Sequence, residues 1–553
     1  MPDLPRPRIA VFSGATSTIA NTQPLVTSNK ARARSGLPLR TNADGSPARF
    51  DVLRPQRLAA PVTVYVRQFS AHPLEADAAD LYAAPDGYLD PSGVFHTERQ
   101  SEQDVPVYEV ELRPEDGLYP LPYMARQASG QAWETDGTEP RAPAEASRQP
   151  FYPDASRLFE EIDRLGVGDD GLGNTLSGRA DFEFFRAAPP GGYKRGLAAS
   201  LRTDAGDGDI PPEQLGEDFW PYRPGHLSSS PPPKRLAQLT NTVQRVLASG
   251  DYAGAIWLEG SPFVEETAYW LHLLIDTEVP ICGNASQRPH GAVGNEGDRN
   301  IVDAVSYIVS RAWADAEGKD ELGVVVIQDQ RIFSAREVQK GDARPGGYVT
   351  TGGHGGIVGG FPEGSGPVIT FRPAMRHTRT SLLSLPRLPE SVLGLRGERV
   401  PIKRGQELLA EAIPAVSLFK HARYSDLGVH EVEARVADSR ARHPLAGIVA
   451  EGAAPYGSLN QWLGAAVRKA AFCGLPVVVV GRGNQEGFAV VGRVPFAIAG
   501  SNLTATKARL LLMAALMKLG ALPAAADPDH PTESEIEATN AKVAEYQALF
   551  NAH

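Results

Sequence analysis

Cysteine is scarce in this sequence, with Cys282 and Cys473 as its two examples among 553 residues. Each lies in an apolar run, VPICG for the first and AAFCG for the second. Two isolated cysteines in so long a chain exclude a disulfide framework and a cysteine-ligated zinc site. We therefore expect both thiols to be buried as small hydrophobic side chains.

Positive charge is also in short supply. The chain has 55 Lys and Arg against 66 Asp and Glu, a formal net charge of −11, and no run of basic residues. Such a surface repels phosphate backbones, so we expect no nucleic-acid partner. No apolar stretch is long enough to span a bilayer, and the N-terminus lacks the charged-then-apolar pattern of a signal peptide. We expect a soluble, cytoplasmic protein with no membrane partner.

Short apolar runs alternate with helical patterns over much of the chain. Runs of Val, Ile and Leu without polar alternation predict parallel strands that are covered on both faces. They lie at residues 8–14, 254–260, 279–283, 322–328, 445–450 and 475–481. Predicted helices lie at residues 262–275, 299–313, 460–473, 506–519 and 533–549. This alternation predicts an α/β protein with two doubly wound parallel-sheet domains.

One long region breaks this rhythm. Residues 32–225 are rich in Pro, Asp, Gly and Tyr. Within them, residues 62–69 and 105–112 resemble alternating strands, and residues 154–165 resemble one helix. We expect an inserted, irregular subdomain that contains β-structure. The predicted boundaries are an N-terminal α/β domain of residues 1–35 and 226–385, an insertion of 36–225, a linker of 386–412 and a C-terminal α/β domain of 413–553.

Small hydroxyl residues follow the first predicted strand, and they include Thr16 and Thr18. A tight turn at the carboxyl end of a strand is where open α/β sheets bind ligands. Backbone N–H groups there can hold an oxyanion, and a threonine can act as nucleophile. Such turns are also common without any chemistry, so this signal alone favours a structural turn.

Two further clusters carry candidate residues. Ser261 comes directly after the strand predicted at residues 254–260 and before a helix, where the helix dipole favours an anion or an alkoxide. It is equally interpretable as an ordinary helix N-cap. Lys340 follows the strand predicted at residues 322–328 after a short turn, and its alternative role is that of a solvated surface lysine.

Taken in order, these clusters resemble the asparaginase/glutaminase family. The resemblance covers residues 9–20 and 236–520. Its motifs are GATSTIA at 14–20, EETAY at 265–269, VPICGNASQRP at 279–289, the segment around Lys340, GGHGGIVG at 352–359 and GSNLTATKARLLLMAAL at 500–516. The resemblance implies an α/β fold and hydrolysis of a carbon–nitrogen bond through an acyl-enzyme, with no metal and no organic cofactor.

The resemblance assigns roles residue by residue. Thr18 matches the family's first threonine, Ser261 its second threonine and Lys340 the lysine paired with the second. Either Thr18 or Ser261 can then be the nucleophile, with Lys340 as base for Ser261. Further expected substrate-binding residues are Thr16, Glu259, Ser229, Ser230, Ser458 and Glu486. The last two match loops that reach the site of a neighbouring subunit, which implies a homodimer or homotetramer.

One departure bears on the substrate. The family's aspartate beside the second threonine, which holds the α-ammonium group of the substrate, is Pro262 here. A buried ammonium without a partner loses several kcal/mol of binding. We therefore expect a small amide, imide or lactam other than free L-asparagine, with the insertion reshaping the site for it. Two alternatives remain, a non-catalytic binding protein on this fold and an ammonia-delivering subunit of an amidotransferase.

Overall fold

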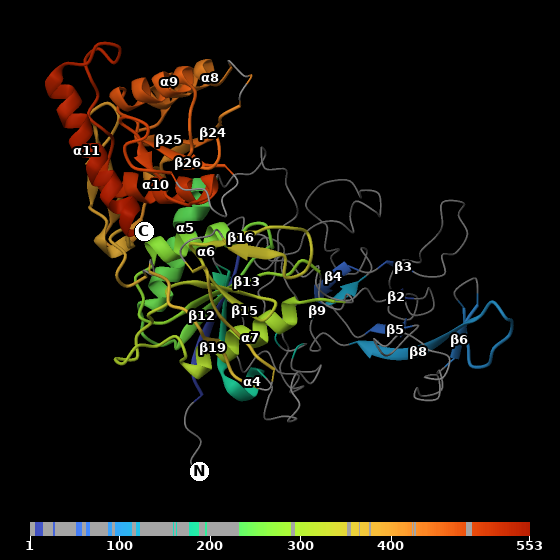
Figure 1. The fold of residues 1–553 in the computed structure, drawn as a ribbon. Helices are drawn as coiled ribbons and strands as arrows, with labels where there is room; N and C mark the ends of the chain where they lie inside the picture. The colour runs from blue at the N-terminus through green and yellow to red at the C-terminus, as the bar shows by residue number, and fades with distance from the viewer. Residues whose placement is uncertain are drawn as a thin grey trace.

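The computed structural model of this chain describes most of two α/β domains and scattered strands of the region between residues 15 and 231. The described residues are 6–14, 26–27, 51–52, 54–57, 62–66, 87–90, 94–112, 118–121, 159, 162, 176–186, 194–195, 232–288, 294–350, 355–363, 365–374, 378–422, 424, 427–482 and 489–553. Figure 1 shows most of the N-terminal domain in green and yellow, with its first strand at residues 8–13 in blue, and the C-terminal domain in orange and red.

In this part of the chain, the larger sheet has nine strands in the order β11-β10-β1-β12-β13-β14-β15-β18-β19. Its centre is parallel from β10 to β14. The parallel strands are β10 (Asp181–Arg186), β1 (Arg8–Ser13), β12 (Gly254–Leu258), β13 (Ile281–Asn284) and β14 (Val325–Gln328). The antiparallel strands at its edges are β11 (Lys194–Arg195), β15 (Arg331–Ser334), β18 (Ile357–Gly360) and β19 (Val368–Ile369).

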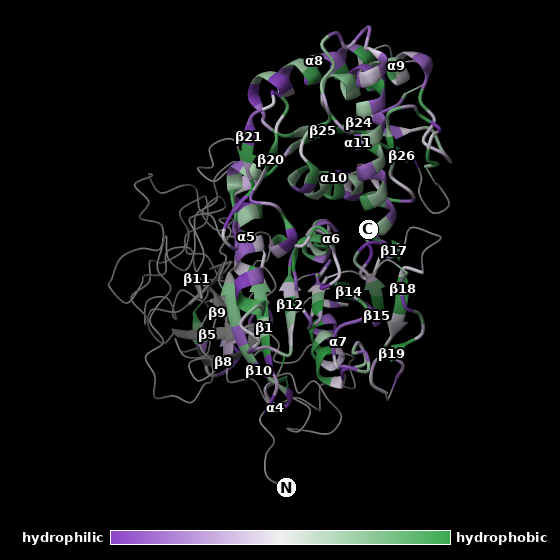
Figure 2. Ribbon diagram, turned by 90° about the vertical axis from the view of Figure 1, so that its left-hand side faces the viewer, coloured by the Kyte–Doolittle hydropathy of each residue, from purple (hydrophilic) through white to green (hydrophobic). Residues whose placement is uncertain are grey.

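Both faces of this sheet are covered, which explains the uninterrupted apolar runs. In β1, Ala10 and Phe12 pack into one hydrophobic cluster, and Ile9 and Val11 pack into another on the opposite face. Helices α5 (Pro232–Leu247) and α6 (Val264–Leu274) contribute to the first cluster, and α7 (Gly297–Ser310) contributes to the second. Figure 2 shows β1 and β12 in the green of hydrophobic residues.

The C-terminal domain is a second parallel sheet, which confirms the expected α/β class. Among the described residues its four strands lie in the order β24 (Ala415–Lys420), β25 (Ala446–Gly452), β26 (Val477–Gly481) and β27 (Ile498–Ala499). Its helices are α8 (Leu427–Arg442), α9 (Gln461–Phe472), α10 (Ala505–Leu519) and α11 (Glu533–Ala552). Side chains of α10 and α6 share one hydrophobic cluster, so the two domains have a continuous core. Cys282 and Cys473 are free and buried, as expected.

One strand from within residues 36–225 completes the N-terminal sheet, contrary to our assignment of that whole segment to an insertion. Strand β10 follows helix α4 (Leu176–Arg179) and pairs in parallel with β1 over its full length. Its side chains Phe182, Phe184 and Phe185 are buried, and so is Phe159, whose ring packs against Phe182 and Phe184. This aromatic content supplies the apolar area that a central strand needs on both faces.

The rest of that segment contributes small antiparallel sheets. One joins β5 (Val62–Val66), β8 (Val105–Leu112), β6 (Gly87–Leu89) and β7 (Phe95–His96). Two others pair β4 (Arg54–Arg57) with β9 (Leu118–Leu121) and β2 (Val26–Thr27) with β3 (Asp51–Val52). The two alternating strands predicted from the sequence are thus confirmed. Of the helix predicted at 154–165, Phe159 and Ile162 are described, and both are helical and buried.

The segment expected to link the domains has structure of its own. It holds two hairpins, β20 (Ser391–Leu393) with β21 (Arg399–Pro401) and β22 (Lys403–Arg404) with β23 (Glu407–Leu408), flanked by the 3₁₀ turns η6 (Leu385–Arg387) and η7 (Ala410–Ala412). The side chain of Asn241 in α5 donates to the carbonyl of Leu408 and accepts from its N–H. This segment is therefore fixed to the N-terminal domain.

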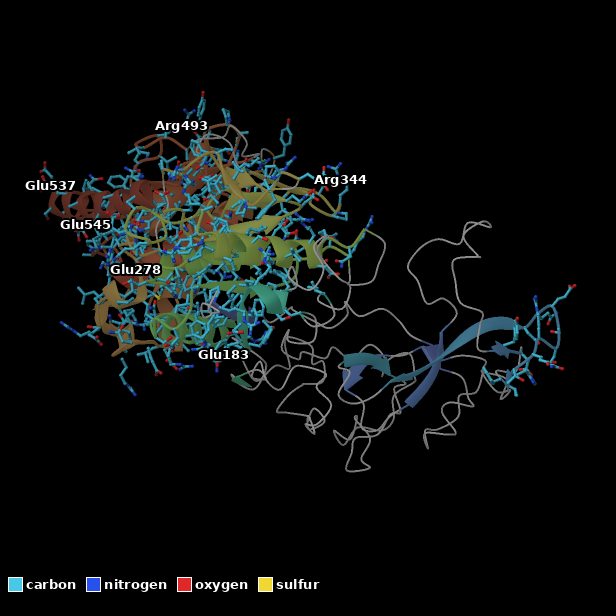
Figure 3. The ribbon with its side chains drawn as sticks, turned by 90° about the horizontal axis from the view of Figure 1, so that it is seen from below. Glu183, Glu278, Arg344, Arg493, Glu537 and Glu545 are labelled. Atoms are coloured by element: carbon cyan, nitrogen blue, oxygen red, sulfur yellow. The ribbon has the colours of Figure 1, made fainter. Side chains whose placement is uncertain are left out.

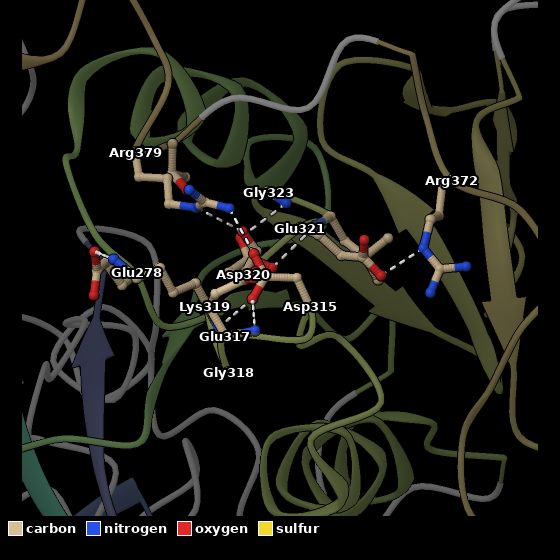
Figure 4. Close-up of polar contacts among 12 residues, drawn as sticks. Glu278, Asp315, Glu317, Gly318, Lys319, Asp320, Glu321, Gly323, Arg372 and Arg379 are labelled. Carbon is tan, nitrogen blue, oxygen red and sulfur yellow. Dashed lines mark hydrogen bonds and ion pairs between the residues drawn. The ribbon is translucent and has the colours of Figure 1, made fainter.

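Ion pairs fix the chain just before this segment to the N-terminal domain (Figure 4). Arg379 Nη2 lies 2.7 Å from Asp315 Oδ2, and Arg372 pairs with Glu321. Between them, Asp320 accepts the backbone N–H groups of Leu322 and Gly323 at 3.1 and 2.9 Å. Burial raises the pKa of Asp320 to about 7.

No helix in the described part of the chain is long and apolar enough to cross a membrane.

Candidate active site

The carboxyl ends of the parallel strands meet at one edge of the N-terminal sheet. The N–H of Gly14, after β1, donates to Leu258 O at 2.8 Å, and the N–H of Glu259, after β12, donates to Asn284 O at 3.1 Å. A Cβ at position 14 would lie 3.0 Å from Leu258 O and from the Trp257 ring. A side chain at this position would crowd both neighbours, so glycine is favoured for this close approach. The expected residues Thr16, Thr18, Ser229, Ser230 and Glu486 lie outside the described residues.

Ser261 lies at this edge, in a turn that the N–H of Phe263 closes on Gly260 O at 3.0 Å. Helix α6 begins at Val264, so Ser261 precedes the helix and does not cap it, which corrects the N-cap interpretation. The side chain is 8% exposed, and its Oγ donates to Gln287 Oε1 at 2.9 Å. Its carbonyl accepts from the hydroxyl of Tyr348 at 2.8 Å.

Lys340 ends strand β16 (Val338–Lys340), which pairs with β17 (Tyr348–Thr350). Its backbone N–H donates to the carboxylate of Glu265 in the first turn of α6. Its Nζ donates to Arg344 O at 2.9 Å and lies 4.6 Å from the centre of the Tyr348 ring. Burial lowers the pKa of Lys340, and nearby carboxylates oppose this effect. Figure 3 shows Arg344 on the side of the molecule opposite Glu537 and Glu545 of α11.

Tyr348 contacts both Ser261 and Lys340, and it is the point where the two candidate residues converge. Its ring carries the ammonium of Lys340 on one face, while its hydroxyl binds the backbone of Ser261. Among the described residues no hydrogen bond joins the two side chains directly. Catalytic hydrogen bonds are often long in structures without substrate. A serine and a lysine of lowered pKa that contact the same tyrosine have the composition of a nucleophile and its base.

Glu259 is held by its own neighbours. Its Oε2 accepts from Trp257 Nε1 at 2.8 Å, and Thr267 of α6 also bonds to its carboxyl group. Burial raises the pKa of Glu259, and these hydrogen bonds oppose the change. The contacts support the alternative that Glu259 is a satisfied carboxylate at the end of a strand, although it lies against Gly14 at the edge of the site.

Ser458 lies in the C-terminal domain, in the loop after β25. Its Oγ accepts from Arg493 Nη2 at 3.0 Å, and the same guanidinium lies 4.9 Å from the centre of the Tyr456 ring. Figure 3 labels Arg493 at the edge of the molecule. These contacts belong to the C-terminal domain alone, so a role for Ser458 at a neighbouring subunit's site stays a prediction.

Three polar residues that the sequence analysis gave no role complete this edge. The N–H of Gln287 donates to Glu296 Oε1 at 2.6 Å, which joins the partner of Ser261 to the residue that precedes α7. Asn300 is fully buried, and its side chain bonds to Ala285 O, Gln328 Oε1 and the N–H of Asp329. Together they fix the loop after β13 against the end of β14. Buried amide side chains that fix loops in this way can be recognised only after the strands around them have been located.

A lysine from the C-terminal domain holds the segment that leads to Lys340. Lys507, in the first turn of α10, is buried, and its Nζ donates to Ala335 O at 2.8 Å, to Arg336 O at 3.0 Å and to Val338 O. Burial lowers the pKa of Lys507 to about 8, against the attraction of Glu265. The position of strand β16 therefore depends on α10.

This contact predicts a pH dependence of stability. The pKa of Lys507 is lower in the folded chain, about 8, than in the unfolded chain, about 10.4. The unfolded state thus binds more protons between these pKa values, and the lysine's contribution to stability rises with pH across that window. We expect the free energy of unfolding of the wild type, relative to Lys507→Met, to increase by on the order of 1–3 kcal/mol between pH 8 and pH 10.

Urea unfolding of both proteins at several pH values measures this difference, with the surface variant Lys420→Met as the matched control. A difference that stays constant from pH 7 to pH 10 would show that the amine of Lys507 does not titrate as its burial demands.

The described residues contain no group of three or more His, Cys, Asp or Glu side chains that could hold a metal ion.

In comparison with known proteins, residues 223–350 match the family model "Asparaginase, N-terminal". L-asparaginase of Bacillus licheniformis is 38% identical over 107 residues, which cover 19% of this chain and 31% of that protein. The glutaminase-asparaginase of Acinetobacter glutaminasificans is 29% identical over 163 residues, which cover 29% and 46%.

The chain thus matches less than half the length of these curated relatives. Among solved structures, a probable cytoplasmic L-asparaginase from Campylobacter jejuni aligns with 58% of this chain and 80% of its own, at 22% identity and a TM-score of 0.42. That score is too low to establish a shared fold, and the fold described above rests on strand order and pairing.

Proposed function

We propose that this chain, whose residues 223–350 match the asparaginase family model, is a divergent member of that family and an amidohydrolase that cleaves a linear or cyclic carbon–nitrogen bond. The observation that carries the proposal is the convergence of Ser261 and Lys340 on Tyr348. The proposed nucleophile, Ser261, follows β12 at the carboxyl edge of a parallel sheet, where α/β enzymes bind their substrates, and Lys340 is its proposed base.

In the proposed reaction a hydroxyl oxygen attacks the carbonyl carbon of the substrate, and Lys340 accepts the hydroxyl proton. The carbon–nitrogen bond breaks as that proton passes to the leaving nitrogen, which leaves an ester on the enzyme. Water then cleaves the ester and restores the hydroxyl. Ser261 is the nucleophile that Lys340 serves in this scheme, and Thr18, four residues after Gly14 in the sequence, is the alternative.

The preferred substrate lacks an α-ammonium group. Pro262 follows Ser261 in its turn, is exposed, and offers neither charge nor hydrogen-bond donor. An ammonium group bound beside Pro262 would therefore find no carboxylate at this position to pair with. Amides, imides and lactams without an amino group need no such partner.

We also infer that the active unit is a homodimer or homotetramer. Large apolar side chains are exposed around the loop of Ser458, with Tyr456 at 46%, Trp462 at 66% and Val491 at 60%. Exposed aromatic and aliphatic side chains gathered in this way mark protein–protein contact surfaces. A second copy of the chain would cover them.

Ammonia or amine release from a panel of substrates tests the proposed activity. The panel holds asparagine, glutamine, and amides, imides and lactams without an α-amino group, and the Pro262→Asp variant is assayed beside the wild type. We expect the wild type to prefer a substrate without the amino group, and Pro262→Asp to improve kcat/KM for asparagine by about tenfold or more. Efficient wild-type turnover of asparagine would refute the substrate assignment, and binding without any turnover would identify a non-catalytic binding protein.

A further inference from the structure

A second buried carboxylate, Glu296, is linked to Ser261 through Gln287, and the reaction described above does not use it. Glu296 immediately precedes α7 and is 7% exposed. Its Oε1 accepts the N–H of Gln287 at 2.6 Å. Its Oε2 is buried, and within the described residues it has no hydrogen-bond partner. A buried carboxylate oxygen without a hydrogen bond destabilises the folded chain by about 1–3 kcal/mol or more. Its presence at this position therefore calls for a functional explanation.

Glu296 is connected to both candidate catalytic residues. Gln287 receives the hydroxyl of Ser261 on its side chain and donates its backbone N–H to Glu296, so one residue links the two. On the other side, the negative charge of Glu296 acts on Lys340. Burial lowers the pKa of that lysine, and Glu296 is the carboxylate that opposes the change most.

The other charged groups around Lys340 are already engaged. Glu265 accepts the backbone N–H of Lys340, and Asp342 pairs with Arg344 at 2.7 Å on the exposed part of the hairpin. The Tyr348 hydroxyl donates to Ser261 O, and burial raises its pKa. The turn of Ser261 offers no acid of its own. Glu296 therefore stands out among these groups as a carboxylate with an oxygen still available.

We propose that Glu296 is a positioning residue for the Ser261–Lys340 pair. It acts on Lys340 through its negative charge and on Ser261 through Gln287. This inference rests on the proposed amidohydrolase function. When the proton of Ser261 moves to Lys340, the amine becomes an ammonium in a partly buried site, and the carboxylate of Glu296 stabilises that charge. Through Gln287, the same carboxylate orients the amide oxygen that receives the serine hydroxyl.

The test measures the pKa of Lys340 without requiring turnover. Lys340 is labelled with acetic anhydride over a range of pH values and quantified by mass spectrometry, in the wild type, in Glu296→Gln and in the control Glu278→Gln at a distant surface ion pair. Removing the carboxylate charge destabilises the ammonium, so the pKa of Lys340 falls by about half a unit to one unit in Glu296→Gln. It stays at the wild-type value in the control.

A kinetic profile gives the second readout. With an accepted substrate, the ascending limb of kcat/KM against pH moves to lower pH in Glu296→Gln by the same amount, and kcat falls about tenfold to a hundredfold. Glu296→Asp keeps the negative charge but moves it one methylene further away. The ascending limb of its pH profile therefore lies between those of the wild type and Glu296→Gln. If Glu296→Gln does not fold, the labelling of Glu296→Asp decides.

The two proposals fail separately. A wild type that hydrolyses no amide refutes the proposed function, and the labelling still reports whether Glu296 acts on Lys340. A pKa of Lys340 that is unchanged in both Glu296 variants overturns the role of Glu296, whatever the activity of the wild type.

Discussion

Replacing Lys340 with methionine is expected to lower kcat and kcat/KM for amide hydrolysis together, by about a thousandfold. Proton transfer by a positioned base contributes about a hundredfold to ten-thousandfold to such reactions. Methionine has a similar length and keeps the packing on the Tyr348 ring, but it accepts no proton. Because the base acts in the transition state, substrate binding and KM should change little.

Steady-state kinetics on the best panel substrate measure this loss, and Lys319→Met, a surface lysine paired with Glu278, is the matched control. Ser261→Ala and Thr18→Ala are assayed in parallel. If Ser261 attacks, its alanine variant and Lys340→Met lose activity to a similar extent and the double variant loses no more. Full activity of Lys340→Met would remove the lysine from the reaction and leave Thr18 as the nucleophile to pursue.

Replacing Arg336 with methionine is expected to destabilise the fold by about 3–5 kcal/mol. The guanidinium is completely buried and forms an ion pair with Glu337. It also donates to Asn502 Oδ1 at 2.8 Å and to His553 O at 2.7 Å. Its loss leaves the carboxylate of Glu337 buried without its cation, and it removes two contacts with the C-terminal domain.

Chemical denaturation followed by tryptophan fluorescence measures this loss. A chain of two domains need not unfold in one step, so the midpoint of each transition is recorded separately. The double variant Arg336→Met/Glu337→Leu removes both charges and should regain much of the stability, because no buried carboxylate is then left without the guanidinium of Arg336. A loss below about 1 kcal/mol for Arg336→Met alone would show that the network carries little energy.

Much of the fold follows from local apolar pattern. Every uninterrupted run predicted as a strand, from residues 8–14 to 475–481, overlaps a strand of the two sheets. Strand β10 was not predicted because its sequence, DFEFFR, lies among Pro, Gly and Asp, and because its partner β1 is more than 170 residues away. Pairing over such a separation is decided by tertiary packing and has no local signal.

The candidate site could be predicted in part. Ser261 and Lys340 follow apolar strands, so pattern and resemblance together identified them, and the structure places both around Tyr348. The residues that join them come from other segments. Gln287 lies 26 residues after Ser261, and Tyr348 lies 87 residues after it. A loop residue of this kind acquires a role from the contacts of the folded chain, which no short-range spacing encodes.

The hydrogen bonds that Lys507 donates to the segment around strand β16 also affect the order in which the site forms during synthesis of the chain. Ala335, one of the carbonyls that it binds, leaves the ribosome 172 residues before Lys507 does. At about 5–20 residues per second, synthesis of that stretch takes roughly ten to thirty seconds. During this interval the N-terminal sheet can form, while the segment before Lys340 still lacks the amine that fixes it. A nascent chain therefore lacks these hydrogen bonds until helix α10 emerges, so the segment that leads to Lys340 is fixed only once the second domain has been made.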